Sequence, residues 1–401
     1  MLFTITATTG GADQAQVAVL DLRTNMQTVL IRGGSDAHYV SSGHLVYTAA
    51  GRLHAVAFDV GRLAVLGSPV MVQPEVPTSA GSAVALEGTL AYVSGAVSSD
   101  GRSLVWVDRQ GHETPIPAPP RNYAFPRFSP DGMRLALYIP DQEVDIWLWD
   151  LAGKTLTRAT FDRGVDIYPV WSADGRQILF SSSRAEGVNL FAQTANGSGE
   201  VTRLTTSPNV QHATSVTPDG TRLVFTESAP TTGQDVMQLR LDGTHAVTPL
   251  VQTPFNERNG EVSPDGRWLA YEADSGGQFN IYVRPFPEVS SGYWQVSTDG
   301  GTRPLWARNS QELFFLNLTG ALMRVGVSHG PARAATAPMK LFDGRYGAAP
   351  NQNGRTYDIA PGGKKFLMIK AGASADQTAA PMSVVVVQNW REELKRLAPT
   401  H

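Results

Sequence analysis

Few of the residue patterns that commonly do chemistry occur in this chain. There is no cysteine, and none of the eight histidines lies within four residues of another, so thiolate ligands and local histidine pairs for a metal ion are excluded. The Gly-x-Ser-x-Gly elbow, the phosphate-binding P-loop, the His-Glu-x-x-His motif and the EF-hand loop are also absent. A catalytic site would therefore combine distant segments. Our candidates are His212 as general base, with Asp166 or Glu257 orienting it or holding a divalent metal ion.

A repeated sequence positions these residues. Phe128–Gly132 reads Phe-Ser-Pro-Asp-Gly, and related words place an aspartate at 131, 174, 219 and 265, at spacings of 43, 45 and 46 residues. Degenerate copies near residues 42, 87, 309 and 361 bring the number to eight. Proline presets φ, aspartate bonds its own backbone and glycine accepts positive φ, so each word predicts a tight turn between two strands. The repeated aspartates are therefore interpreted as turn residues, not as a carboxylate cluster.

The repeat also predicts the fold. Four short strands in about 44 residues are typical of a propeller blade. We expect an all-β protein, a β-propeller of four-stranded blades over residues 1–388, with eight blades and an incomplete first blade at 1–34. The alternative is a six-bladed C-terminal propeller plus a partial N-terminal one, divided near the proline-rich stretch 115–120. Residues 389–401 are expected to form a short C-terminal helix and tail.

The innermost strands of a propeller line an axial channel, and the residues that begin these strands surround one mouth. In this chain those residues are polar and differ from blade to blade, whereas the turn residues hardly vary. Ligands favour concave sites with convergent polar groups. A hydrated mouth without function is the alternative. The predicted ligand-binding residues are Arg121, Tyr123, Asp166, Tyr168, His212, Glu257, Asn259 and Arg303, and Asp36 and His38 hold the same place near the N-terminus.

Composition limits the classes of partner. The net charge is −3 and charged residues make up 17% of the chain, so no basic field favours nucleic acid. No apolar run approaches the roughly 18 residues of a membrane span, and the N-terminus lacks the features of a signal peptide. We therefore expect a soluble chain that does not insert into a membrane and is cytoplasmic as encoded. No cofactor is expected, apart from the divalent ion that a channel site would accommodate.

The repeat words carry a family resemblance. Trp171–Ser181 and Val262–Tyr271 resemble the TolB-like, WD40-related PD40 propellers of bacteria. More narrowly, Leu104–Arg109, Val283–Pro287 and Val385–Trp390 resemble the propeller that follows the kinase domain and membrane helix in some bacterial serine/threonine kinase-like proteins. The Gly-rich loop, His-Arg-Asp and Asp-Phe-Gly of kinases are absent, so phosphoryl transfer is not implied.

We therefore predict a non-catalytic module that binds a ligand or a protein partner at the channel mouth. By resemblance, it would be the sensor or scaffold part of a bacterial signalling protein. As part of a longer membrane kinase-like protein it would lie outside the cytoplasm or in the periplasm. Because propellers also include enzymes, the alternative is a hydrolase of ester or phosphoester bonds, or a lyase, with a site in the mouth that a metal ion would assist.

Overall fold

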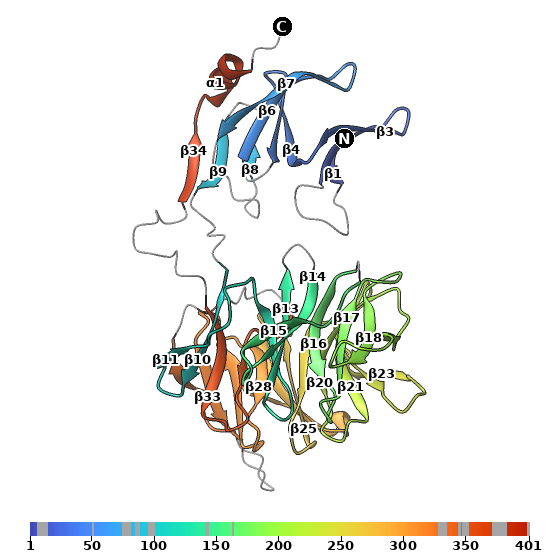
Figure 1. Cartoon of the computed structure of the whole chain (residues 1–401), viewed down its shortest axis with the longest axis vertical. Coiled ribbons are helices and arrows are strands. Elements are labelled where there is room, and N and C mark those ends of the chain that lie inside the picture. Colours follow the sequence, from blue (N-terminus) through green and yellow to red (C-terminus); the bar gives the residue numbers. More distant parts are fainter. Residues whose placement is uncertain are drawn as a thin grey trace. The chain divides into compact units, whose positions relative to one another are not determined.

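The computed structural model (Figure 1) describes residues 1–5, 15–49, 52–73, 82–84, 89–94, 101–140, 144–162, 164–327, 335–343, 346, 353–370 and 383–398. The chain forms two compact units. Unit 1 comprises Met1–Asp100 and Ala373–His401, and unit 2 comprises Gly101–Gly372. Among the described residues, no helix has the length and apolar character needed to cross a membrane.

Unit 2 is built from antiparallel four-stranded sheets. Five of them take four consecutive strands each, in the order in which the chain runs, and the sixth combines strands from the two ends of the unit. The five are β12 (Ala124–Phe128), β13 (Arg134–Pro140), β14 (Val144–Asp150) and β15 (Thr155–Arg158); β16 (Asp166–Trp171), β17 (Gln177–Ser182), β18 (Asn189–Thr194) and β19 (Thr202–Arg203); β20 (Val210–Val216), β21 (Arg222–Ala229), β22 (Gly233–Arg240) and β23 (Val247–Val251); β24 (Glu257–Val262), β25 (Trp268–Ala273), β26 (Asn280–Pro285) and β27 (Trp294–Gln295); and β28 (Thr302–Trp306), β29 (Glu312–Leu316), β30 (Leu322–Gly326) and β31 (Met339–Phe342).

The repeated words form the turns between the first two strands of the sheets, as predicted. Oδ1 of Asp131 accepts hydrogen bonds from Oγ of Ser129 at 2.5 Å and from the backbone N–H of Met133 at 2.9 Å. Gly132 has φ of +72°, which glycine adopts without a steric penalty. These hydrogen bonds hold the pKa of Asp131 below its usual value. The carboxylates therefore stabilise the turns.

Hydrophobic cores lie between successive sheets. One cluster joins β13 and β14 to β17 and β18 through Ala136, Ile146, Phe180 and Phe191. Equivalent clusters join each following pair of sheets, and two more join the sixth sheet to its neighbours on either side. Each sheet therefore packs on two others, which is the packing of propeller blades around an axis.

The sixth sheet closes this ring. Its order is β11 (Glu113–Pro115), β10 (Ser103–Asp108), β33 (Lys365–Lys370) and β32 (Asp358–Ile359). β10 and β33 pair through six residues, from Ser103 opposite Lys370 to Asp108 opposite Lys365. The pairing joins strands more than 250 positions apart in the sequence and places the stretch 115–120 directly after the outer strand of this sheet.

Within the described residues, unit 1 contains one four-stranded and two three-stranded sheets. Their orders are β1–β2–β3, β4–β5–β6–β7 and β34–β9–β8, and helix α1 (Trp390–Leu397) packs Trp390 and Leu394 against Val46 and Leu53. Asp36 and His38 lie on β4, with Nε2 of His38 3.2 Å from Oδ1 of Asp36. The strands are β1 (Leu2–Ile5), β2 (Gln16–Asp21), β3 (Met26–Arg32), β4 (Ser35–Val40), β5 (His44–Ala49), β6 (Arg52–Asp59), β7 (Ala64–Gln73), β8 (Ser82–Val84), β9 (Leu90–Ser94) and β34 (Ser383–Val387).

The all-β propeller of four-stranded blades is confirmed. The expected number of eight blades is not confirmed. Within the described residues, unit 2 holds six four-stranded sheets, the number given by the alternative interpretation. The domain boundaries expected from the sequence stay a prediction, and the degenerate repeat at 85–88 and the tail at 399–401 fall outside the described residues.

Candidate functional site

Four inner strands of unit 2, namely β12, β16, β24 and β28, share a β-bulge near their start. Pairing with the second strand shifts register at this point, and the bulged residues have positive φ, from 49° for Phe125 to 58° for Arg303. A bulge re-aims the side chain that it carries. Tyr168 and Asn259 hold the equivalent positions, and the ring centroids of Phe125 and Tyr168 lie 4.5 Å apart although they belong to different sheets. The bulges therefore bring these side chains toward a common centre.

That centre is occupied by the chain itself. Asn353–Tyr357, which we call the plug, precedes β32 and runs between the bulged residues. The backbone N–H of Gly354 donates to Oδ1 of Asn259 at 2.9 Å, and Nε of Arg303 donates to the Gly354 oxygen at 3.0 Å. Nδ2 of Asn353 lies 2.9 Å from Nδ1 of His212. The polar side chains that we expected to face a ligand thus bind a segment of their own chain.

The structure brings together half of the predicted ligand-binding residues. Tyr168, His212, Asn259 and Arg303 meet around the plug, and the rings of Tyr168 and His212 are 4.6 Å apart. That these four bind a ligand stays a prediction.

The other four lie in separate local networks. Arg121 packs over the ring of Trp147, and Oη of Tyr123 donates to the Pro119 oxygen. Asp166 is paired with Arg184 at 2.6 Å, and Glu257 accepts from the backbone and hydroxyl of Thr253. A ligand role for these residues also stays a prediction.

The three catalytic candidates are engaged separately. Within the described residues, no hydrogen bond or ion pair joins His212 to Asp166 or to Glu257. Burial raises the pKa of both carboxyl groups and lowers the pKa of His212 to about 4. In the same part of the chain, no group of three or more His, Asp or Glu side chains is placed to hold a metal ion. Neither catalysis nor a metal ion gains support from this arrangement.

The buried histidine predicts a pH dependence. Because the folded-state pKa of His212, about 4, lies below the ordinary value of 6.5, the unfolded state binds more protons between these values. Stability contributed by neutral His212 is therefore complete above pH 6.5 and is lost as the pH falls toward 4. Urea unfolding at pH 7, 6, 5 and 4 should show this decline, and His212→Gln should reduce its slope. An unchanged slope in the variant would assign the decline to other groups.

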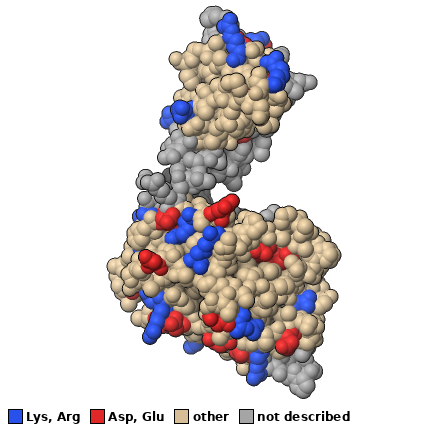
Figure 2. Space-filling view, turned by 90° about the vertical axis from the view of Figure 1, so that its right-hand side faces the viewer, with Lys and Arg blue, Asp and Glu red and all other residues tan. Residues whose placement is uncertain are grey.

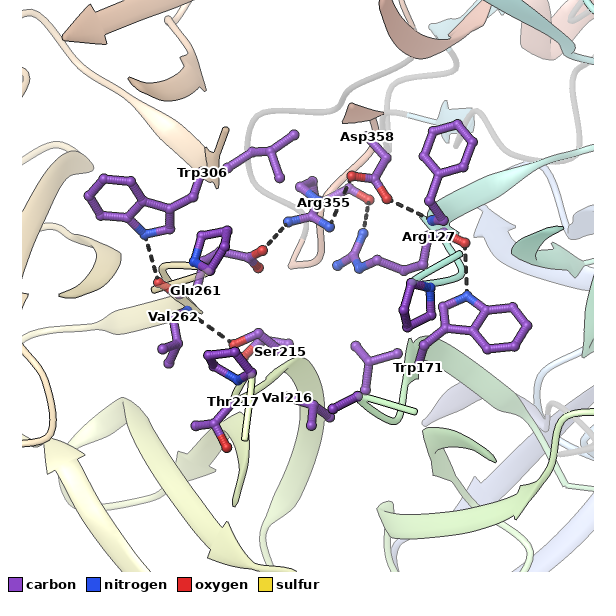
Figure 3. Close-up of a pocket in the computed structure, with 18 of the residues that line it drawn as sticks. Arg127, Trp171, Ser215, Val216, Thr217, Glu261, Val262, Trp306, Arg355 and Asp358 are labelled. Carbon is purple, nitrogen blue, oxygen red and sulfur yellow. Dashed lines mark hydrogen bonds and ion pairs between the residues drawn. The ribbon is translucent and has the colours of Figure 1, made fainter. Parts of the chain in front are cut away.

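A cavity of about 400 Å³ lies at the other end of the same strands, where they run into the repeated turns (Figure 3). All six sheets contribute to its wall. The polar side chains toward the centre are Arg127, Glu261, Arg355 and Asp358, and the apolar wall includes Trp171, Val216, Val262 and Trp306. Pro130, Pro218 and Pro264 of the turns stand at its rim together with Ala173 and Arg308.

The cavity holds two arginines and two carboxylates, and both carboxylates pair with the same arginine, Arg355. Nη1 of Arg355 lies 2.7 Å from Oε1 of Glu261, and Nη2 lies 3.4 Å from Oδ1 of Asp358. Both carboxylates raise the pKa of Arg355 despite its burial. Arg127 instead donates from Nη1 to the main-chain oxygens of Pro126 and Arg355, at 3.0 and 3.2 Å. Burial and the neighbouring Arg355 lower the pKa of Arg127 to about 9.

The two tryptophans are fixed in orientation by the preceding sheet. Nε1 of Trp171 donates to the Arg127 oxygen at 3.0 Å, and Nε1 of Trp306 donates to the Glu261 oxygen at 3.1 Å. The indole N–H groups are thus satisfied, as buried indoles require. Both rings present carbon surface to the cavity. The site combines a charged centre with a rigid aromatic wall.

The candidates predicted from the sequence lie at the opposite end of these strands, and the four central charges of the cavity were not among them. In the sequence, three of these charges could have been recognised at the position just before the aromatic or aliphatic residue that begins each repeat word. Arg127, Glu261 and Asp358 stand there, whereas Val170 and Leu305 occupy the same position in other sheets. A charge in a buried strand is uncommon unless it is paired.

A second cavity, of about 620 Å³, lies beside β19 and β23. It is lined by Arg203, Gln211 and Glu227 among others. Its central carboxylate already accepts hydrogen bonds from Gln211 and Ser207, at 2.8 and 2.9 Å. Because this carboxylate is already hydrogen-bonded, we regard the cavity on the axis as the stronger candidate. On the face of unit 2 that Figure 2 shows, acidic and basic side chains stand side by side.

The fold and the axial cavity define the class of protein, a β-propeller with a concave site where the inner strands end. Residues 115–283 match the family model of the TolB beta propeller domain, PD40. The chain is similar to a protein assigned as TolB from Agrobacterium tumefaciens, with 17% identity, coverage of 71% of this chain and 100% of the other, and a TM-score of 0.57. It is also similar to TolB from Acinetobacter baumannii, with 16% identity, coverage of 82% and 79%, and a TM-score of 0.50.

These matches confirm the expected resemblance to TolB-like PD40 propellers. At 16–17% identity, the likeness to the solved structures shows the fold alone. The narrower resemblance to kinase-associated propellers stays a prediction.

Proposed function

We propose that the chain is a non-catalytic binding module that receives a ligand or protein partner in the axial cavity of unit 2. The observation that carries the proposal is the cavity itself, in which charged side chains from three sheets converge beside two oriented tryptophans. Concave sites of this size with a few placed polar groups are typical of binding sites. The match of residues 115–283 to the TolB beta propeller domain supports a protein as the partner.

The rest of the proposal concerns the kind of protein to which this propeller belongs and its location in the cell. A propeller of this type would serve as sensor or scaffold in a bacterial signalling protein, outside the cytoplasm if it belongs to a longer membrane kinase-like protein. The support is the resemblance of three short segments, including Leu104–Arg109 on β10. The binding site that we propose differs from the one expected from sequence, because the plug fills the centre among the bulged residues.

Site-specific crosslinking tests the proposal. A photo-reactive amino acid at Ala173 or at Arg308 would stand at the cavity rim, and the same amino acid at Thr248 on the outer strand β23 would serve as control. We expect the rim positions, but not Thr248, to crosslink one defined partner in cells that produce the protein. Equal crosslinking at all three positions, or none at the rim, would contradict a binding site in this cavity.

A further inference from the structure

We infer that the axial cavity recognises a carboxylate group carried on an apolar body, with Arg127 as its binding residue. The inference rests on the proposed function, since it names the chemical group that the cavity would bind. A carboxylate reaches a protein in two ways, as a free organic acid or as part of a protein segment, and the experiment below separates them.

The first argument is the incomplete pairing of Arg127. Its side chain lies at the end of β12, the residue is only 6% exposed, and its Nε–H is buried without a hydrogen-bond partner. No ion pair joins Arg127 to a carboxylate in the part of the chain that the structure describes. Figure 3 shows its guanidinium directed toward the centre of the ring of inner strands. A buried donor without an acceptor destabilises the folded protein, and more so when it is charged. An anionic acceptor would therefore remove this desolvation penalty.

The second argument is that the carboxylates of the cavity are already engaged. Glu261 and Asp358 both pair with Arg355. Oδ2 of Asp358 also accepts from the backbone N–H of Phe128 at 2.8 Å, and Oδ1 accepts from the N–H of Ile359 at 2.8 Å. These contacts hold Asp358 in the strand ends rather than against Arg127. An acceptor for Arg127 would therefore come from outside the chain.

The third argument is the charge balance, which limits the kind of anion. Arg355 and Arg127 face Glu261 and Asp358, so the four central groups sum to zero at neutral pH. A multiply charged anion such as a phosphate monoester would be repelled by the two carboxylates at short range. A monoanion that takes a single guanidinium meets less of this repulsion. A carboxylate also matches the planar fork of arginine, which favours two parallel N–H···O bonds.

The fourth argument is the wall. Beyond Arg127 the cavity presents Trp171, Val216, Val262 and Trp306. The indole N–H groups are bonded to main-chain oxygens, so the rings offer carbon surface, and apolar ligand groups gain roughly 25 cal/mol for each Å² that they bury. The carbon body next to the carboxylate would therefore be apolar, aromatic or aliphatic.

Two pairs of probes test the inference with the full-length protein in isothermal titration calorimetry. The free-acid pair is phenylacetate and phenylacetamide, which share shape and differ in charge. The protein-borne pair is a capped pentapeptide with a central glutamate and the same peptide with glutamine. We expect at least one acid to bind about tenfold or more tightly than its amide, since a charge-assisted hydrogen bond contributes about 1.5–3 kcal/mol. Preference for phenylacetate would assign a free acid, and preference for the glutamate peptide a protein segment.

Variants identify the binding residue. Arg127→Leu should abolish the preference for acid over amide, and Arg127→Lys should retain part of it, because lysine keeps the charge without the fork. Arg240→Leu is the control, since Arg240 is exposed on β22 and pairs with Asp242 at 2.5 Å. If Arg127→Leu does not fold, the comparison of acid with amide in the unaltered protein still decides. No preference for either acid, or a preference that survives in Arg127→Leu, would overturn the inference, while crosslinks at the rim would still support binding in the cavity.

Discussion

Replacing Glu272 by alanine should lower the free energy of unfolding by about 3–5 kcal/mol, the cost of removing one partner from a buried ion pair. Glu272 lies on β25 and has no exposed surface. Its carboxylate pairs with Nε of Arg258 at 3.2 Å, accepts from Nδ2 of Asn259, and accepts from the backbone N–H of Arg303 at 3.1 Å. Arg258 is itself 5% exposed in its side chain, so the substitution would remove a carboxylate that pairs with a buried cation.

The consequence would reach the plug, because Asn259 and Arg303 are the residues that hold Gly354. Urea unfolding followed by tryptophan fluorescence measures the effect. Glu272→Gln keeps the shape and one acceptor oxygen, so its loss should be smaller than that of Glu272→Ala. Glu200→Ala, at an exposed position, should change stability by about 0.5 kcal/mol or less. If Glu272→Ala unfolds at the same urea concentration as Glu200→Ala, the ion pair does not stabilise the ring.

Gly354→Ala should lower the free energy of unfolding by about 2–6 kcal/mol through two independent costs. The residue has φ of +85°, and an added Cβ would lie 2.6 Å from Cε1 of Tyr168 and 2.7 Å from Cδ1 of Phe125. Positive φ costs a non-glycine residue about 1–3 kcal/mol, and overpacking a filled core costs about 1–3 kcal/mol. Neither ring can move away freely, since each also packs against a further ring, Tyr138 for Phe125 and His212 for Tyr168.

Two other glycines separate these costs. Gly320 has φ of +83° with no atom within 4 Å of an added Cβ, so Gly320→Ala measures the backbone cost alone. Gly276 has open space and an ordinary φ, so Gly276→Ala should be close to neutral. The difference between the urea-unfolding midpoints of Gly354→Ala and Gly320→Ala measures the cost of the steric collision in the plug. Equal midpoints would mean that the plug yields without cost and does not fix the bulged residues.

The fold was predictable because its signals are local and repeated. Ser129, Asp131 and Gly132 determine one turn by their own chemistry, and the regular spacing of such turns fixes the blade. The closure of the ring was harder to predict from the sequence. β10 pairs with β33, although most of unit 2 lies between them in the sequence, and no local pattern encodes a pairing between strands so far apart. The same limit applies to β34, which pairs with β9 in unit 1 although it follows β33 in the chain.

The site was predicted only in part, for a physical reason. Symmetry placed Tyr168, His212, Asn259 and Arg303 around one centre, and the structure brings them there. Symmetry does not predict what fills that centre, because Asn353–Tyr357 lies outside the repeat. The charged cavity depends on that irregular segment too, since Arg355 of the plug pairs with Glu261. A segment that belongs to no repeat thus occupies the centre around which four predicted residues meet, and it also contributes Arg355 to the axial cavity.

The closing sheet has a mechanical consequence. The two chain segments that leave unit 2 start next to Ser103 and Lys370, which face each other at the same end of the β10–β33 pair. Tension transmitted through these segments would load the antiparallel pair from one end, so its hydrogen bonds would break in succession, as in a zip, rather than all at once. At the far end, Arg109 binds Glu312 at 2.6 Å and the Gly363 oxygen at 3.0 Å, and this clamp would be the last contact to yield. We therefore expect tension on these two segments to open the ring at the β10–β33 pair.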